Sequence, residues 1–413
     1  MRVLLITRHF PPVCCGVGDY ASRLAAELTA EGNFVTVLTA PTGAARHASF
    51  EFRELPLGGR QDPRAVLEAV AAAKPDRVLF EYSGSAWGRW SAPLWVNSLL
   101  FRLRRRGFAV HAGLHELAIS IRQHPLHTPV ALAQWLHVAL ILWAAESAAV
   151  NMRSRADLLV RLFPWWRRKI QYRPNSSTIP VKPLAQADRS AFRSGHGAGL
   201  GETVVATFGM FHRAKNYEGL IDAFGLLRRS TPAKLWMLGN TAAASPEYVA
   251  RLKRAACAAG VEEHVWWPGK LEAEEVSRAL QAADVFVLPQ PDGHLTRSSA
   301  FMAAAEHGLP VVAVRQPGGR DQMEFTHGEH VWFAGRGTAE ELAAGMLALA
   351  EDPDLAARMG QSLRELYAAR FAWSVTASMA MGDSAIHVPS GTESLTAQRE
   401  GVARATHAGG AKS

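Results

Sequence analysis

The pattern that most constrains this chain is an alternation of short apolar runs and helix-like segments, which starts at residue 2 and starts again near residue 203. Continuous apolar runs such as 2–7 and 203–209 are typical of strands that are buried on both faces of a parallel sheet. Segments with helical periodicity, such as 19–31 and 216–229, follow these runs. Repeated strand–helix–strand units form doubly wound sheets. The sequence therefore predicts an α/β protein with two Rossmann-like doubly wound domains.

A polar stretch with prolines, 175–201, separates the two predicted domains. We expect an N-terminal domain over 1–175 and a C-terminal domain over 176–371, because a chain of 413 residues suits two hydrophobic cores better than one. The expected strands are 2–7, 34–40, 76–83, 108–115, 148–152, 169–174, 203–209, 234–239, 264–269, 284–289 and 309–314. Residues 384–413 are rich in small residues without periodicity, so a disordered tail is expected there.

Composition excludes several classes of protein. Lys and Arg outnumber Asp and Glu by 45 to 37, which gives a net charge of +8 and a pI near 9.7. This surplus is too small for a histone-like nucleic-acid binder, but it is compatible with a polyanionic ligand or an acidic membrane surface. Three cysteines cannot form a disulfide framework, and no secretory signal follows the first strand, so a cytoplasmic protein is expected. The most apolar window, 129–145, is too short to span a bilayer and is expected to form a buried helix.

A glycine-rich loop follows the first expected strand and opens a helix. Gly16 and Gly18 formally match the Gly-x-Gly-x-x-Ala part of a dinucleotide fingerprint. In that fingerprint the first glycine closes the strand directly, whereas eight residues with two prolines separate Thr7 from Gly16. The second strand also lacks a terminal acidic residue that could hold a ribose. Nicotinamide binding is therefore disfavoured, and the loop fits either a phosphate or sugar site or a plain tight turn.

Basic side chains follow two strands of the second domain, at the sheet edge where open α/β sheets bind ligands. Arg213 and Lys215 come after the strand 203–209, and Lys270 comes after 264–269. Lysine is scarce in this chain, with eight among the 45 basic residues, so a lysine at this edge is more informative than an arginine. The pattern predicts a diphosphate site at Lys215, while a solvated lysine explains Lys270 equally well.

A third motif follows the strand 284–289. A turn at Asp292 and Gly293 leads to the segment Thr296–Ser299, which begins a helix. Free backbone N–H groups, hydroxyls and the charge of Arg297 at a helix start are typical of an anion site. The alternative is that the hydroxyls only cap the helix.

His115 ends the strand 108–115 at the same kind of edge, which favours a functional side chain over a structural one. Two stretches that combine basic and aromatic residues, 101–108 and 162–169, fit either a membrane or acidic acceptor contact or solvated helix faces. No zinc-type Cys/His spacing, paired carboxylates that demand a metal, or Gly-x-Ser-x-Gly elbow occurs in the sequence.

Together these motifs resemble the retaining glycosyltransferases of family 4, which have the GT-B fold of two Rossmann-like domains facing a cleft. The resemblance covers residues 1–382 and rests on FPPVCCGVGDYASRLAAELTAEG, LHEL, FGMFHRAKNYEGLIDAF, VWWPGKL and DGHLTRSSAFMAAAEHGLPVV. It implies transfer of a sugar from a nucleotide-diphosphate donor to an acceptor hydroxyl with retention, without a metal or other cofactor. It also implies that the segment 372–383 crosses back to the first domain.

The resemblance also assigns site residues. The implied catalytic residues are His115, Arg213 and Lys215. The implied donor-binding residues are Gly209, Gly269, Lys270, Asp292, Gly293, Thr296, Arg297, Ser298 and Ser299. Gly16 and Gly18 belong to the acceptor-side loop, and no protein nucleophile is evident.

Two features depart from the family pattern. Met210 stands where the family has an arginine, and Arg213 is the candidate replacement. The family's Glu-x7-Glu signature falls on Leu295 and Ala303. The chain therefore resembles a sub-group without the acidic pair, in which the segment Thr296–Ser298 holds the donor.

These expectations leave three alternatives open. They are a sugar-nucleotide epimerase of the same fold, a dehydrogenase, which the long spacer between Thr7 and Gly16 disfavours, and a catalytically weak nucleotide-sugar-binding partner subunit. The expected setting is polysaccharide or glycoconjugate biosynthesis. The expected partners are a nucleotide-sugar donor, a hydroxyl acceptor and, through a peripheral contact, the inner membrane face, but not nucleic acid.

Overall fold

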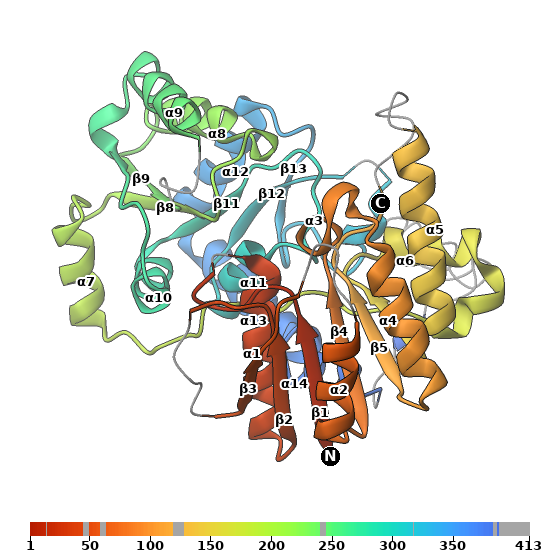
Figure 1. Cartoon of the computed structure of the whole chain (residues 1–413). Helices are drawn as coiled ribbons and strands as arrows, with labels where there is room; N and C mark the ends of the chain where they lie inside the picture. The colour runs from red at the N-terminus through yellow and green to blue at the C-terminus, as the bar shows by residue number, and fades with distance from the viewer. Residues whose placement is uncertain are drawn as a thin grey trace, which may run out of the picture.

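The computed structural model describes the chain except for Cys14, Pro317 and residues 44–48, 58–62, 119–127, 240–244, 383–385 and 388–413. Two α/β domains, each built on a mainly parallel sheet, lie side by side, the first drawn from red to yellow and the second from green to blue (Figure 1). The predicted fold class is confirmed.

The N-terminal sheet has the strand order β14-β7-β6-β5-β4-β1-β2-β3. Its strands are β1 (Arg2–Thr7), β2 (Phe34–Thr39), β3 (Glu51–Glu54), β4 (Arg77–Tyr82), β5 (Val110–Leu114), β6 (Ser147–Val150), β7 (Ile170–Tyr172) and β14 (Ile386–His387). All neighbours are parallel except β14, which pairs antiparallel with β7. Ile386 and His387 form this short strand, and the other residues of the predicted tail 384–413 lie outside the described residues.

The C-terminal sheet has the order β10-β9-β8-β11-β12-β13, with every pair parallel. Its strands are β8 (Thr203–Phe208), β9 (Ala233–Leu238), β10 (Val265–Trp266), β11 (Val285–Leu288), β12 (Val311–Val314) and β13 (Trp332–Ala334). The strand expected over 264–269 is only two residues long, because Pro268 has no N–H for a ladder and Gly269 turns the chain with φ +77°.

Helices cover both faces of each sheet. Those of the first domain are α1 (Gly16–Ala30), α2 (Arg64–Ala73), α3 (Gly84–Trp87), α4 (Leu94–Arg105), α5 (Thr128–Ala144) and α6 (Arg153–Leu162), with the 3-10 turns η1 (Arg89–Ser91) and η3 (Pro164–Lys169). Those that follow are α7 (Gln186–Gly195), α8 (Tyr217–Leu227), α9 (Pro246–Ala258), α10 (Ala273–Ala282), α11 (Ser299–Glu306), α12 (Ala339–Glu351), α13 (Pro353–Arg370) and α14 (Trp373–Met381), with η4 (Arg213–Lys215), η6 (Glu262–His264) and η7 (Arg320–Gln322).

The apolar strands explain this layering. Along β1, Leu4 and Ile6 pack into the core on one face of the sheet, and Val3 and Leu5 pack into the core on the other. This period of two is that of a pleated strand, and both sets are buried because helices cover both faces.

The last helix belongs to the core of the first domain. Trp373 and Ala377 of α14 are buried with Leu24 of α1, and the Trp373 ring lies 5.2 Å from that of Tyr20. The chain thus leaves the second domain after α13 and packs on the first (Figure 1).

Helix α5 forms where a buried helix was expected, but that expectation is wrong for one of its faces, where Leu132, Leu136 and Trp143 are exposed. Among the described residues, no helix is long and apolar enough to cross a membrane.

Candidate active site

Two adjoining cavities of about 450 and 600 Å³ lie at the carboxyl edges of the strands. The second-domain cavity is lined mainly by the segments 208–210, 269–271 and 298–300. Most of the residues that line the first-domain cavity belong to that domain, among them His9, Ser85 and His115. The residues that line both are Cys15, Gly16, Thr178, Met210, Arg297 and Ser299. Because these residues are shared, the cavities form two halves of one cleft. Their volumes are in the usual range for small-molecule sites.

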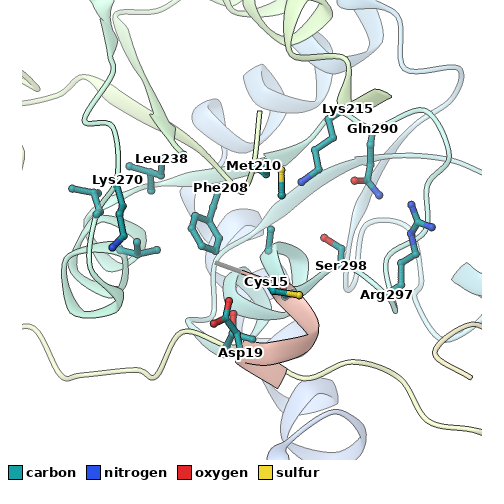
Figure 2. A pocket seen from close by; sticks show the side chains of 18 of the residues that line it. Cys15, Asp19, Phe208, Met210, Lys215, Leu238, Lys270, Gln290, Arg297 and Ser298 are labelled. Atoms are coloured by element: carbon teal, nitrogen blue, oxygen red, sulfur yellow. The ribbon is translucent and has the colours of Figure 1, made fainter. Parts of the chain in front are cut away.

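Lys215 points into the second-domain cavity from η4, directly after β8 (Figure 2). Gly209 makes room for it, because a Cβ at this position would lie 2.9 Å from Lys215 Nζ and its φ of +133° suits glycine. Burial and the charge of Arg297 lower the pKa of Lys215. No ion-pair partner of Lys215 is found in the part of the chain that the structure describes. This half-buried ammonium is therefore available to an anionic ligand.

Arg213 does not join Lys215. Its side chain is exposed and lines neither cavity. Met210 lines both cavities at the position of the family's arginine. The cation whose charge acts on Lys215 is Arg297, and it lowers the pKa of the lysine.

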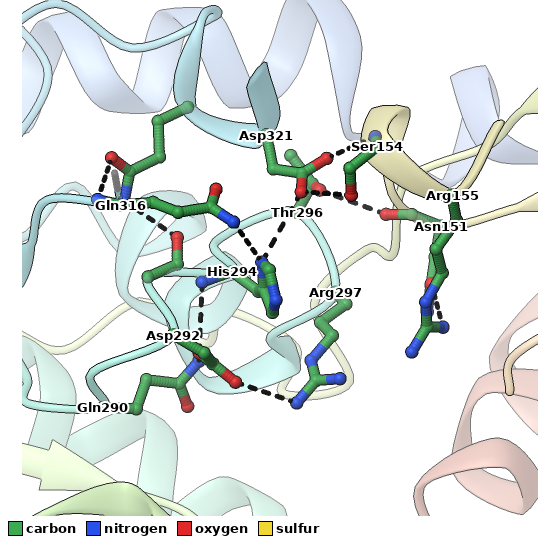
Figure 3. Close-up of polar contacts among 12 residues, drawn as sticks. Asn151, Ser154, Arg155, Gln290, Asp292, His294, Thr296, Arg297, Gln316 and Asp321 are labelled. Carbon is green, nitrogen blue, oxygen red and sulfur yellow. Dashed lines mark hydrogen bonds and ion pairs between the residues drawn. The ribbon is translucent and has the colours of Figure 1, made fainter. Parts of the chain in front are cut away.

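The start of α11 faces the second-domain cavity with Ser298, Ser299 and Ala300. Ser298 Oγ accepts the N–H of Phe301 at 3.2 Å, so this residue caps the helix as the alternative interpretation predicts. Arg297 forms an ion pair with Asp292 at 3.1 Å (Figure 3).

Thr296 does not reach the cavity. It is buried, and its Oγ1 donates to the carbonyl of Asn151 in the first domain at 3.0 Å. The Thr296 carbonyl accepts the N–H of Asn175 at 2.9 Å. Thr296 therefore joins the two domains, and sequence reasoning could not identify a partner 145 residues away.

Asp292 and Gly293 shape the loop before α11 and line neither cavity. Asp292 Oδ1 accepts from Gln290 Nε2 at 2.9 Å, and the Gly293 carbonyl accepts from Gln322 Nε2 at 2.8 Å. A Cβ on Gly293 would lie 2.7 Å from Gln322 Nε2, and its φ is +59°. Of this group only Gln290, which the sequence did not single out, lines the cavity.

Lys270 and Gly269 also line the second-domain cavity, and Figure 2 shows Lys270 across from Lys215 and Arg297. Lys270 is exposed and pairs with Glu272 at 3.1 Å. Both predicted lysines therefore line the cavity, and Lys215 is the more buried of the two.

His115 lines the first-domain cavity and is held from behind by Glu81. Its Nε2 lies 2.7 Å from Glu81 Oε2, and Arg173 Nη2 lies 2.9 Å from Glu81 Oε1. Burial alone would raise the pKa of Glu81, but the charge of Arg173 and the hydrogen bond with His115 outweigh it and lower that pKa to about 2. Gly113 makes room for the group, since a Cβ there would lie 2.0 Å from Glu81 Oε2.

Glu81 and Arg173 were missed by sequence reasoning. The available signal was the acidic residue inside the apolar run RVLFEY of β4, because an unpaired carboxylate is rarely buried in a strand covered on both faces.

The two glycines of the first loop differ in position. Gly16 lines both cavities, whereas Gly18 lines neither. A Cβ on Gly18 would lie 3.0 Å from the carbonyl of His9, so this glycine lets α1 pack closely on the preceding loop. Asp19, which the sequence did not single out, lines the second-domain cavity, and burial raises its pKa.

The positions of the family's acidic pair are part of the core. Leu295 and Ala303 are both fully buried among apolar residues of the second domain. Within the described ranges, no three His, Cys, Asp or Glu side chains gather as metal ligands do.

Residues 188–366 match the family model described as glycosyl transferases group 1. This match covers most of the C-terminal domain. A curated relative, the GDP-mannose-dependent alpha-(1-6)-phosphatidylinositol monomannoside mannosyltransferase of Mycolicibacterium smegmatis, is 26% identical over 338 residues, which are 76% of this chain and 81% of the relative. The family match and this relative indicate that the chain is a glycosyltransferase.

Solved structures share the transferase's fold. Sucrose-phosphate synthase from Thermosynechococcus elongatus has a TM-score of 0.69 and 18% identity, over 92% of this chain and 97% of that one. HepE from Anabaena, solved with UDP-glucose, has a TM-score of 0.68 and 17% identity, over 92% of this chain and 98% of that one. These similarities show the two-domain GT-B arrangement.

Proposed function

We propose that the transferase moves a sugar from a nucleotide-diphosphate donor to an acceptor hydroxyl with retention of the anomeric configuration. The observation that carries this proposal is the half-buried Lys215 ammonium beside the start of α11, in a cavity at the carboxyl edge of β8. The retention follows from the resemblance to the family 4 enzymes.

In this reaction the bond between the anomeric carbon and the diphosphate oxygen breaks, and a bond to the acceptor oxygen forms. The acceptor proton leaves with the nucleoside diphosphate. Negative charge grows on the departing diphosphate, so cations and N–H groups that are already in place lower the barrier. Lys215, Arg297 and the backbone N–H groups at the start of α11 supply this stabilisation. We therefore propose that no metal ion or other cofactor is needed.

The first-domain cavity takes the transferred sugar and the acceptor in this proposal. His115 lines this cavity, and the contact of its Nε2 with Glu81 holds the ring in place, so we propose that His115 contacts the transferred sugar. Gly16 lines both cavities, and because it has no side chain, its backbone can approach a sugar that lies between them.

The relative from Mycolicibacterium smegmatis suggests which substrates to test first. Its name states a GDP-mannose donor and a phosphatidylinositol mannoside acceptor. We propose GDP-mannose as the first donor and a lipid-linked saccharide as the acceptor class, in glycoconjugate biosynthesis.

Calorimetric titration with GDP-mannose and UDP-glucose tests the donor site. The wild-type chain should bind one of them, and Lys215→Ala should weaken that binding at least about tenfold, because a hydrogen bond to a charged group contributes about 1.5–3 kcal/mol. Lys253→Ala, which removes an exposed lysine of α9, is the matched control and should bind like the wild type. Equal affinities of the Lys215 variant and the control would exclude Lys215 from the donor site.

A nucleotide-sugar-binding subunit with little turnover is the second candidate, because Arg213 lies outside the cavity and the positions of the acidic pair are apolar. Donor binding without release of nucleoside diphosphate under any acceptor would favour this candidate.

A further inference from the structure

Helix α5 has an arrangement of side chains opposite to that of an ordinary surface helix. Leu132, Leu136 and Trp143 lie on one helical face by their spacing of four and seven residues, and they are 58%, 60% and 41% exposed. The two polar residues of the helix interior, Gln134 and His137, are buried instead. An apolar helix face that points outward indicates a surface that contacts something other than water.

The buried polar residues fix this orientation. Gln134 Nε2 donates to the Trp90 carbonyl in η1 at 2.8 Å. His137 Nδ1 lies 2.5 Å from Asn97 Oδ1 of α4, and Asn97 Nδ2 donates to the His137 carbonyl at 3.2 Å. Because these bonds hold α5 against its neighbours, the leucines face outward as part of the folded structure.

The neighbouring elements extend the apolar face. Trp90 and Leu94 are 61% and 71% exposed. Trp90 has a φ of +66°, a conformation that a bulky residue rarely adopts and that surrounding structure must maintain. Figure 1 shows α4 and α5 side by side on the flank of the first domain that faces away from the second. We call the set Trp90, Leu94, Leu132, Leu136 and Trp143 the α4–α5 face.

Positive charge is concentrated in the same part of the chain. Residues 82–187 contain fourteen basic residues and only three acidic ones, so this segment more than accounts for the net charge of +8. Exposed arginines end α4, namely Arg102, Arg104, Arg105 and Arg106. The guanidinium of Arg104 lies 5.1 Å from the Trp143 ring, which joins the basic cluster to the apolar face.

We propose that the α4–α5 face docks on the surface of an anionic lipid bilayer. Leucine and tryptophan side chains enter the boundary between headgroups and acyl chains, and the arginines bind headgroup phosphates. A second copy of the chain is the less suitable occupant, because a two-fold interface would bring the arginines of both copies together. Residues 388–413 carry two acidic and three basic residues, so this tail does not complement the charge either.

Docking through this face would place the first-domain cavity near an acceptor in the membrane. Ser85 and Ala86 of α3 line the first-domain cavity, and the chain runs from α3 directly into η1 with Trp90. A saccharide anchored in the bilayer therefore has a short path from the docked face to that cavity. The inference goes beyond the proposed reaction, since vesicle binding is measured without any nucleotide sugar and succeeds or fails independently of donor binding.

Co-sedimentation of the full chain with vesicles tests the proposal. We expect binding to vesicles of phosphatidylcholine with phosphatidylglycerol, weaker binding to phosphatidylcholine alone, and a loss of the difference at high salt. The double variant Leu132→Glu/Leu136→Glu should lower the partition coefficient at least about tenfold, because exposed leucines no longer enter the interface. Arg105→Ala and Arg106→Ala should each lower it about fivefold on the anionic vesicles only.

Leu200→Glu is the matched control, since Leu200 is fully exposed in the second domain and its variant should partition like the wild type. Circular dichroism and donor titration of each variant check that the fold is retained. Equal partitioning of the Leu132/Leu136 variant and the control would overturn the proposal. A second result would also overturn it. In that case the wild type does not bind vesicles, and light scattering shows a wild-type dimer that dissociates in the Leu132/Leu136 variant.

Discussion

Glu81→Gln tests the buried group that holds His115. Glu81 is fully buried between His115 and Arg173, and these partners hold its pKa at about 2, compared with 4.5 for an unperturbed glutamate. A difference of this size corresponds to about 3 kcal/mol of stability at neutral pH. Because the folded-state pKa is depressed, this contribution is present above the unfolded-state pKa and is lost as the pH falls toward 2.

The wild-type first domain should therefore lose about 2 kcal/mol of unfolding free energy through this group between pH 7 and pH 3. Glu81→Gln leaves Arg173 buried without its counter-charge, which should cost about 3–5 kcal/mol at pH 7. The variant should also show a correspondingly flatter dependence on acid pH, since it has no carboxylate to protonate at this position.

Urea unfolding followed by tryptophan fluorescence at several pH values between 3 and 7 measures both effects. Glu68→Gln, which changes an exposed glutamate of α2 in the same domain, is the control and should leave the curves nearly unchanged. A Glu81→Gln variant that is as stable as this control at pH 7 and keeps the wild-type dependence on pH would show that Glu81 does not stabilise the first domain in this way.

Three further predictions concern the cleft. In calorimetry, Gly209→Ala should raise the donor Kd at least about tenfold, because the new Cβ would lie 2.9 Å from Lys215 Nζ. Gly201→Ala is the control and should leave the donor Kd unchanged, because Gly201 also has a positive φ but a Cβ there would have nothing within 4 Å. Thr296→Ala should lower the unfolding free energy by about 1 kcal/mol in urea and leave the donor Kd unchanged, since the hydroxyl bonds Asn151 across the domains; a weakened Kd at unchanged stability would return Thr296 to the donor site. Turnover should survive excess EDTA, and a loss that only added Mg²⁺ or Mn²⁺ restores would contradict charge stabilisation by the protein alone.

Local patterns in the sequence were sufficient to predict the main elements of the fold. Continuous apolar runs identify β1 and β8 because both sheet faces are covered, whereas the polar run EFRE of β3 carries no such signal. Helix α5 shows the limit of this reasoning. Its apolar composition predicts a helix but not which face is buried, because the bonds of Gln134 and His137 to other elements decide that.

The candidate site was predictable only where a side chain and its ligand-facing edge are close in sequence. Lys215 follows its strand by a few residues, and the structure places it in the cavity. Arg213 lies on the same turn but lines neither cavity, and the local sequence does not distinguish the two positions. Thr296 looks like a donor ligand in sequence, yet its partner Asn151 comes from the other domain, and such long-range pairing is visible only in the folded chain.

We propose that this transferase moves a sugar with retention and that Lys215 stabilises the departing diphosphate. The most direct measurement is a proton NMR time course of the chain with GDP-mannose, with and without a lipid-linked saccharide, in wild type and Lys215→Ala. We expect release of nucleoside diphosphate together with a first-formed product of the donor's own anomeric configuration, and a rate about a hundredfold lower in the variant. A first product of inverted configuration, an epimerised sugar nucleotide without release of nucleoside diphosphate, or equal rates in the two proteins would contradict it.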